Sequence, residues 1–502
     1  MLYIGVDLGT SAVKLLLMDE NGKIKNIVSK EYPLSFPNPG WSEQNPKDWF
    51  EKSMEGIREL TKDCDKSQVQ GISFGGQMHG LVVLDDEDEV IRPAILWNDG
   101  RTTKETDYLN TVIGKETLSK YTANIAFAGF TAPKILWMKE NEPELFAKIN
   151  KIMLPKDYLA YKLSGTFCTD YSDASGMLLL DVQNKCWSQE MIDICGIREE
   201  QLPKLFESYE VVGSLKQEIA EELGLSKTVK VIAGAGDNAA AAVGTGTVGD
   251  GRCNLSLGTS GTIFISSKQF GVDENNALHS FDHADGYYHL MGCMLSAASC
   301  NKWWMDEILQ TKEYEKEQEN ITKLGENQVF YLPYLMGERS PHNDPLARAA
   351  FVGMTMDTTR EEMTQAVLEG VAFGLRDSLE VARSLGIQIE RTKICGGGAK
   401  SPLWKKIIAN VMNLKVDVIE SEEGPGYGAA ILAAVGCGAY ESVEAATEKL
   451  VKVVDTVEPS QELVAKYEER YQNFRKIYPA MKGLFQEIGK REELKKALLL
   501  LL

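Results

Sequence analysis

The same four residues, Leu-Gly-Thr-Ser, occur twice in the chain, at positions 8–11 and 257–260. About half of the 502 residues separate the two copies. Each copy lies between two short apolar runs, which is typical of a turn joining two strands. Backbone N–H groups and hydroxyls in such a turn can bind a phosphate group. Two turns, one in each half, therefore predict that a single phosphate chain is bound from both sides.

Charged residues flank the first turn. Asp7 ends the preceding apolar run, and Lys14 follows the turn. A carboxylate beside a phosphate turn is well placed to hold Mg²⁺, directly or through waters, so we predict Asp7 as a metal ligand. One such turn alone could equally be an ordinary Asx-stabilised turn, but the second copy favours binding. The predicted phosphate-binding residues are Gly9, Thr10, Ser11, Lys14, Gly258, Thr259 and Ser260.

A single aspartate, Asp237, lies among small residues at 234–242. Small side chains let a ligand and the backbone approach closely. A carboxylate at the start of a helix stays ionised, because the helix dipole favours the anion. These properties suit a general base that accepts a hydroxyl proton during phosphoryl transfer. The alternative is that Asp237 only caps a helix beginning at Asn238, and the two roles are compatible.

A glycine triplet at 396–398 follows an apolar run and precedes a helical pattern at 402–413. Exposed backbone at a strand-to-helix turn can accept a phosphate or the face of an adenosine. A plain entry loop to the helix is an equal alternative for the triplet by itself. We predict nucleotide contacts at Gly397, Gly398 and Ala399.

A glycine-rich loop at 75–80 carries Met78 and His79. We expect His79 to be an exposed polar tip that binds a hydroxyl or a carbonyl group. Trp97 adds a stacking face, and Asp99 and Arg101 add hydrogen-bonding groups, which are the usual needs of a sugar pocket.

The elements that must position these residues follow the same order in both halves. We expect hairpin strands around the turn at 19–22, a helix starting at Pro46, strands at 69–74 and 81–84, and helices within 132–150, 188–225 and 360–384. Strand followed by helix in both halves indicates duplication of one α/β unit. The glycine-rich stretch 244–251 is the expected junction, which divides the chain into 1–246 and 247–502.

Composition limits the class of protein. A chain of 502 residues is long enough for two domains. The net charge of −19 argues against nucleic acid or an anionic membrane as a partner, but not against ATP held by backbone amides and a metal. The nine cysteines include no Cys-x-x-Cys pair, and no apolar run reaches the length of a membrane span, so we expect a cytoplasmic protein with reduced thiols. A homodimer is compatible with the sequence.

Taken together, these residues resemble the FGGY family of carbohydrate kinases from residue 4 to about residue 480. The Asp-Leu-Gly-Thr turn marks only the wider superfamily of sugar kinases, actin and chaperone ATPases. More specific segments resemble the family members that act on xylulose rather than glycerol or ribulose. These segments are Gly-Gln-Met-His-Gly at 76–80, Trp-Asn-Asp-Gly-Arg at 97–101 and Gly-Glu-Arg-Ser-Pro-His at 337–342.

The resemblance implies an α/β fold of two duplicated actin/hexokinase-like (ribonuclease H-like) domains around a central cleft. It implies that residues 1–246 bind mainly sugar and residues 247–502 mainly nucleotide. The implied reaction is phosphorylation of D-xylulose at O5 by ATP with Mg²⁺, with Asp237 as general base. The implied sugar contacts are Met78, His79, Trp97, Asp237 and Asn238.

Two alternatives are weighed against this function. Another ketose or a polyol could be the substrate of the same family. A protein of a different class, such as a chaperone ATPase domain or a filament protein, would share the two-turn cleft but would need a partner-binding module or an assembly surface. The polar, glycine-lined loops at the cleft favour the sugar kinase.

Overall fold

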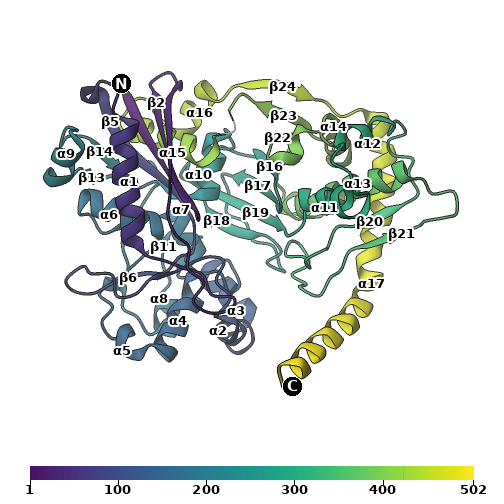
Figure 1. Ribbon diagram of the computed structural model, residues 1–502, viewed down its shortest axis with the longest axis horizontal. Helices are drawn as coiled ribbons and strands as arrows, with labels where there is room; N and C mark the ends of the chain where they lie inside the picture. Colours follow the sequence, from purple (N-terminus) through teal and green to yellow (C-terminus); the bar gives the residue numbers. More distant parts are fainter. Residues whose placement is uncertain (422, 502) are drawn as a thin grey trace.

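The computed structural model describes residues 1–421 and 423–501, with side chains described up to residue 490. It contains two large mixed sheets, one in each half of the chain (Figure 1). The first sheet has the order β13-β14-β5-β1-β2-β3, with β15 paired to β5. Its strands are β1 (Leu2–Leu8), β2 (Ala12–Asp19), β3 (Ile24–Glu31), β5 (Val69–Gly76), β13 (Val211–Ser214), β14 (Lys230–Ile232) and β15 (Ala235–Gly236).

The second sheet has the order β18-β19-β17-β16-β22-β23-β24. Its strands are β16 (Cys253–Leu257), β17 (Gly261–Ser267), β18 (His279–Asp282), β19 (Tyr288–Met294), β22 (Arg391–Cys395), β23 (Lys415–Ile419) and β24 (Val453–Val457).

The two sheets repeat one pairing pattern. In the first, β1 is antiparallel to β2 and parallel to β5, and β14 is parallel to β5 but antiparallel to β13. In the second, β16 is antiparallel to β17 and parallel to β22, and β23 is parallel to β22 but antiparallel to β24. The predicted duplication of an α/β unit is therefore confirmed, strand by strand. Each Leu-Gly-Thr-Ser copy joins the two strands that begin the pattern.

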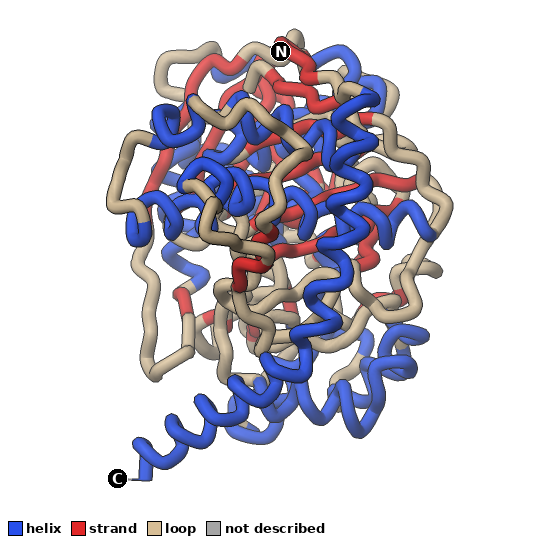
Figure 2. The backbone as a smooth tube through the Cα atoms, turned by 90° about the vertical axis from the view of Figure 1, so that its right-hand side faces the viewer, coloured by secondary structure: helices blue, strands red, loops and turns tan. Residues whose placement is uncertain are grey.

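Helices cover both sheets. In the first half, α1 (Pro46–Leu60) packs on β2 and β3. In the second half, α13 (Arg360–Ser384) and α14 (Pro402–Met412) pack together beside the sheet. The last helix, α17 (Gln461–Leu501), begins against this half and its final turns project from the body (Figure 2). None of the described helices is long and apolar enough to cross a membrane.

Local signals placed several elements correctly. Helix α1 begins at Pro46, and the Asn45 side chain accepts the Lys47 N–H at 3.1 Å as its cap. Helix α13 has the predicted bounds. The helical expectation over 188–225 is wrong in its middle. Two short helices, α8 (Gln189–Cys195) and α9 (Gln217–Leu223), flank β12 (Lys204–Phe206) and β13. Strand β13 forms because β14 offers it a partner, and such pairing overrides local periodicity.

Two small-residue helices bring the halves into backbone contact. These are α10 (Asp237–Gly244) and α15 (Gly424–Gly436). A Cβ atom added to Gly428 would lie 1.8 Å from the Ala240 carbonyl oxygen, and one added to Gly244 would lie 2.1 Å from the Gly424 carbonyl oxygen. Helix α15 also lies on β1, where a Cβ on Gly5 would be 2.0 Å from the Gly426 oxygen. Only glycine permits these approaches.

Through this packing, part of the second half of the sequence contributes to the hydrophobic core against the first sheet. Helix α15 and the following α16 (Val443–Leu450) share one hydrophobic cluster with β1, β2 and α10. The predicted boundary between residues 246 and 247 lies in the loop after α10. The division into 1–246 and 247–502 stays a prediction.

Replacing Gly428 with alanine should destabilise the protein, because the added methyl meets backbone that cannot move aside. Overpacking in a core costs about 1–3 kcal/mol, so we expect a lower midpoint of urea denaturation. Gly483→Ala is the matched control. Gly483 also lies within a helix, a Cβ there meets nothing within 4 Å, and alanine favours a helix by about 1 kcal/mol over glycine. Equal midpoints for the two variants would contradict the close contact.

Candidate active site

Three parallel strands end side by side at the edge of the first sheet. Asp7 on β1 is in register with Gly75 on β5, and Gly75 is in register with Ala235 on β15. Asp237 follows β15 directly, at the first position of α10. The carboxyl ends of parallel strands are the usual ligand-binding edge of an open α/β sheet. Asp7 and Asp237, which lie far apart in the sequence, therefore meet at one edge.

Both carboxylates have raised pKa values, mainly because they are buried. Burial raises the pKa of Asp237 to about 7, and the nearby charge of Asp7 contributes to the same shift. Burial also raises the pKa of Asp7 to about 6, against the opposing effect of Lys14. The N–H of Asn238 donates to Oδ1 of Asp237 at 2.8 Å and partly offsets the shift. The helix begins at Asp237 itself, with Gly236 as N-cap, so Asp237 is not the cap of a helix starting at Asn238.

The first Gly-Thr-Ser turn lies beside this pair. The Gly9 N–H donates to the Ala12 carbonyl at 3.0 Å and closes the turn. Trp97 donates from Nε1 to Oγ1 of Thr10 at 3.0 Å, which brings the indole over the turn. Lys14 makes an ion pair with Glu423, which immediately precedes α15. The predicted phosphate-binding cation is thus shared with a carboxylate from the other half of the sequence.

The loop after β5 holds Met78 and His79 against α10. The Asn238 side chain lies 3.7 Å from the Met78 sulfur. His79 has φ 70°, its Nδ1 lies 2.7 Å from the Gly176 carbonyl oxygen, and its ring stacks on Phe130 with centroids 4.7 Å apart. Burial lowers the pKa of His79 to about 3, so the imidazole is neutral near pH 7. The expectation of an exposed tip is wrong, because the ring is packed on two sides.

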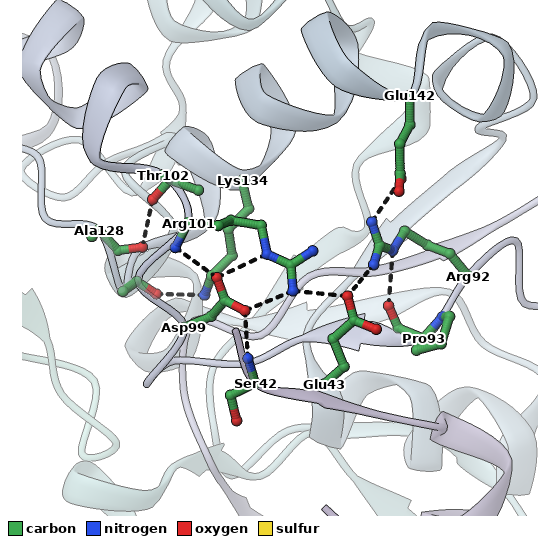
Figure 3. A network of polar contacts seen from close by, with 11 residues as sticks. Ser42, Glu43, Arg92, Pro93, Asp99, Arg101, Thr102, Ala128, Lys134 and Glu142 are labelled. Carbon is green, nitrogen blue, oxygen red and sulfur yellow. Dashed lines mark hydrogen bonds and ion pairs between the residues drawn. The ribbon is translucent and has the colours of Figure 1, made fainter. Parts of the chain in front are cut away.

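Asp99 and Arg101 do not offer their polar groups to a pocket. The Arg101 guanidinium lies on the Trp41 ring at 3.7 Å. It also bonds to both Asp99 and Glu43 at 2.7 Å (Figure 3). Asp99 also accepts the Ser42 N–H at 2.6 Å. Both side chains are buried and paired with each other, so they hold the loop in place. Trp97, in contrast, is 47 % exposed and stays available for contact.

The second Gly-Thr-Ser turn borders a cavity of about 790 Å³ that also touches the glycine triplet. The Thr259 carbonyl accepts the Ala297 N–H at 3.0 Å and the Ser299 hydroxyl at 2.7 Å. Strand β16 is parallel to β22, so the turn and the triplet lie at the same sheet edge. Gly396 has φ 90° and would place a Cβ 2.7 Å from the Leu257 oxygen, which explains the glycine there. Gly397 and Gly398 line the cavity, and Ala399 follows them in a short 3-10 helix.

Sequence reasoning missed much of the wall of this cavity. These residues come from the start of α11 (Ala298–Trp303), from α12 (Tyr314–Glu319) and from the start of α14. They are Ala298, Ser299, Asn301, Lys302, Tyr314, Gln318 and Leu403. Ala298 and Ser299 belong to a small-residue stretch that could have been noticed, but α12 carries only the charges of an ordinary solvated helix.

Asp7 has the character of a magnesium ligand. No hydrogen bond reaches its carboxylate among the residues that the structure describes, and Asp237 supplies a second hard oxygen donor nearby. Within the same described ranges no group of three or more His, Cys, Asp or Glu side chains forms a metal site. A few carboxylates suit Mg²⁺, which usually keeps its waters and binds substrate phosphates rather than filling an all-protein cage.

Comparison with known proteins agrees with this architecture. The model of the FGGY family of carbohydrate kinases, N-terminal domain, matches residues 2–244, and that of the C-terminal domain matches residues 253–437. The fold and the two matching domains thus define a carbohydrate kinase, and the chain belongs to the FGGY family.

Curated relatives and solved structures are similar along nearly the whole chain. A xylulose kinase of Bacillus subtilis is 39% identical, with 96% of this chain and 97% of the relative covered. A xylulose kinase of Lactococcus lactis is 40% identical, with 95% and 97% covered. The crystal structure of a xyloylose kinase from Brucella ovis has a TM-score of 0.92 and 40% identity, covering 96% of this chain and 100% of that one.

The raised pKa of Asp237 gives a direct prediction. In the protein without ligands its carboxyl should be protonated below and ionised above a midpoint near pH 7. Infrared difference spectra between wild type and Asp237→Asn should isolate this carboxyl. Removing the neighbouring charge by Asp7→Asn should move the midpoint to lower pH, because the Asp7 anion raises it. A midpoint near the ordinary value of about 3.9 in the wild type would refute the assignment.

Proposed function

We propose that the enzyme transfers the γ-phosphoryl group of ATP to O5 of D-xylulose. The observation that carries the phosphotransfer is the meeting of Asp7, Asp237 and the first Gly-Thr-Ser turn at one sheet edge. The choice of xylulose is supported by relatives named xylulose kinase at 38–40% identity over almost the whole chain. We assign sugar binding mainly to residues 1–246 and nucleotide binding mainly to residues 247–502.

Asp237 is the proposed general base. A carboxylate with an ordinary pKa is a weak base toward an alcohol, whereas a pKa of about 7 brings the group close to the working pH. It aligns the sugar hydroxyl and accepts its proton late in the transfer. The transition state of phosphoryl transfer is loose, so alignment and charge stabilisation contribute more than early deprotonation.

The turns and the metal ligand are proposed to hold the phosphates. Thr10 and Thr259, from opposite halves, offer backbone N–H and hydroxyl groups to the phosphate chain. Gly397, Gly398 and Ala399 border the nucleoside end of the same site. Asp7 would hold Mg²⁺, which supplies charge neutralisation of the phosphate oxygens when bound. The carboxylates in this part of the protein need such a cation, because the charge of Lys14 is already balanced by Glu423.

The sugar is proposed to lie along Met78, His79, Trp97 and Asn238. The neutral imidazole of His79 can exchange hydrogen bonds with sugar hydroxyls without adding charge. Small pockets discriminate poorly between sugars that differ by one group unless a buried polar atom is left unpaired. Another ketose or a polyol of the same size is therefore the alternative substrate.

A coupled ADP-release assay over pentuloses, pentitols, gluconate and glycerol tests the substrate. We expect the highest kcat/KM with D-xylulose, and we expect the product to carry its phosphate on O5 by ³¹P–¹H NMR correlation. Turnover of glycerol or ribulose without turnover of xylulose would reject the specific substrate while leaving the kinase assignment in place.

Asp237→Ala tests the base. Loss of general-base assistance should lower kcat by about 10²–10⁴-fold with little change in the dissociation constant of ATP. Asp193→Ala is the control, because Asp193 is an exposed carboxylate on a helix of the same half. Turnover of Asp237→Ala within a few-fold of wild type would exclude the role.

A further inference from the structure

A cation from the second half of the chain lies beside the sugar-binding residues of the first. The Arg339 guanidinium carbon is 5.2 Å from the centre of the Phe127 ring. Phe127 contacts Phe130 with centroids 5.3 Å apart, and Phe130 stacks on His79. The positive charge of Arg339 is close enough to add to the lowering of the His79 pKa.

The Arg339 guanidinium is not committed to a carboxylate. Among the described side chains, those of residues 1–421 and 423–490, no Asp or Glu forms an ion pair with it. Even its neighbour Glu338 does not: Oε1 of Glu338 accepts the backbone N–H groups of Leu295 at 3.0 Å and Arg339 at 2.8 Å, and Oε2 has no partner. Arg101, which also lies against aromatic rings, is in contrast paired with two carboxylates, Asp99 and Glu43. A half-buried arginine with free donors needs an acceptor, which a ligand can supply.

The loop that carries Arg339 is fixed to the nucleotide side. Glu338 is 2 % exposed and anchors the loop through the two N–H groups above. Ser340 exchanges two hydrogen bonds of 3.0 Å with the backbone of Cys293 on β19. Strand β19 pairs with β17, which begins directly after the Thr259 turn. Arg339 therefore moves with the second phosphate turn when the halves move relative to each other.

We propose that Arg339 is a sugar-binding residue supplied by the second half, and that it donates hydrogen bonds to the end of the ketose remote from the transferred hydroxyl. This inference rests on the proposed function. Asp237 marks the reacting end, Asn238 contacts Met78, and His79 comes next in the loop. Phe130 and Phe127 continue the line to Arg339. These groups lead from the reacting end toward Arg339, so we assign the 1-hydroxyl of the ketose to the guanidinium.

The arrangement also links the two substrates. Because Arg339 is tied to the second phosphate turn, its bonds to the sugar form only when the second half is in place. Contact with the sugar would thereby favour the arrangement in which the nucleotide phosphates meet the hydroxyl.

Steady-state kinetics of Arg339→Met with the best sugar substrate of the wild type tests the proposal. Loss of charged hydrogen bonds of about 1.5–3 kcal/mol should raise KM for the sugar by roughly 10–100-fold, with KM for ATP within twofold. Arg339→Lys should recover part of the loss. Arg475→Met is the control, because Arg475 contacts the Tyr471 ring at 5.6 Å on α17 and should leave the sugar KM unchanged.

The same assay with the analogue of the ketose that lacks the 1-hydroxyl separates contact from structure. Wild type should bind this analogue more weakly than the parent sugar. The Arg339→Met substitution should then weaken binding of the analogue little further. The proposal would be overturned if Arg339→Met weakened binding of the sugar and of the analogue by the same factor. A sugar KM for Arg339→Met within twofold of wild type would also overturn it. If the wild type did not turn over xylulose, the proposed substrate would be rejected instead. The test of Arg339 would still stand, because it uses whichever ketose the wild type prefers.

Discussion

The contact between α10 and α15 is the constraint on which the site depends. The two helices meet through glycine and alanine, with the Gly428 Cα against the Ala240 carbonyl. Helix α10 begins with Asp237, and α15 is preceded by Glu423, the partner of Lys14. Any side chain at the contact would push apart the helix that carries the proposed base and the sheet that carries Asp7.

Burial then sets the chemistry at this junction. Burial at this sheet edge raises the pKa of both carboxylates, and the charge of Asp7 adds to the larger shift of Asp237. An isolated surface aspartate would be too weak a base to assist an alcohol. A divalent cation near Asp7 would relieve the repulsion when nucleotide binds. Under the proposed mechanism, the electrostatic cost of this pair in the free protein would be relieved when the substrates and the metal bind.

Several features could be predicted because they depend on local spacing. The repeated Leu-Gly-Thr-Ser indicated the duplication, and the strand pairing of both sheets confirms it. The cap at Asn45 and the bounds of α13 also followed from local signals. The helical expectation for 188–225 failed only in its middle, where β13 forms by pairing with β14. Asp99 and Arg101 were taken for pocket residues because composition cannot show that they bind each other.

The sequence by itself determined the duplicated units, the two phosphate turns and the family, since these are carried by residues close together in the chain. Only the tertiary structure decided that Asp7 and Asp237 share one edge, that Lys14 pairs with Glu423, and that α12 walls the cavity beside the second Gly-Thr-Ser turn. It also brought Arg339 to Phe127. These contacts join segments that lie far apart in the sequence, and no local pattern encodes them.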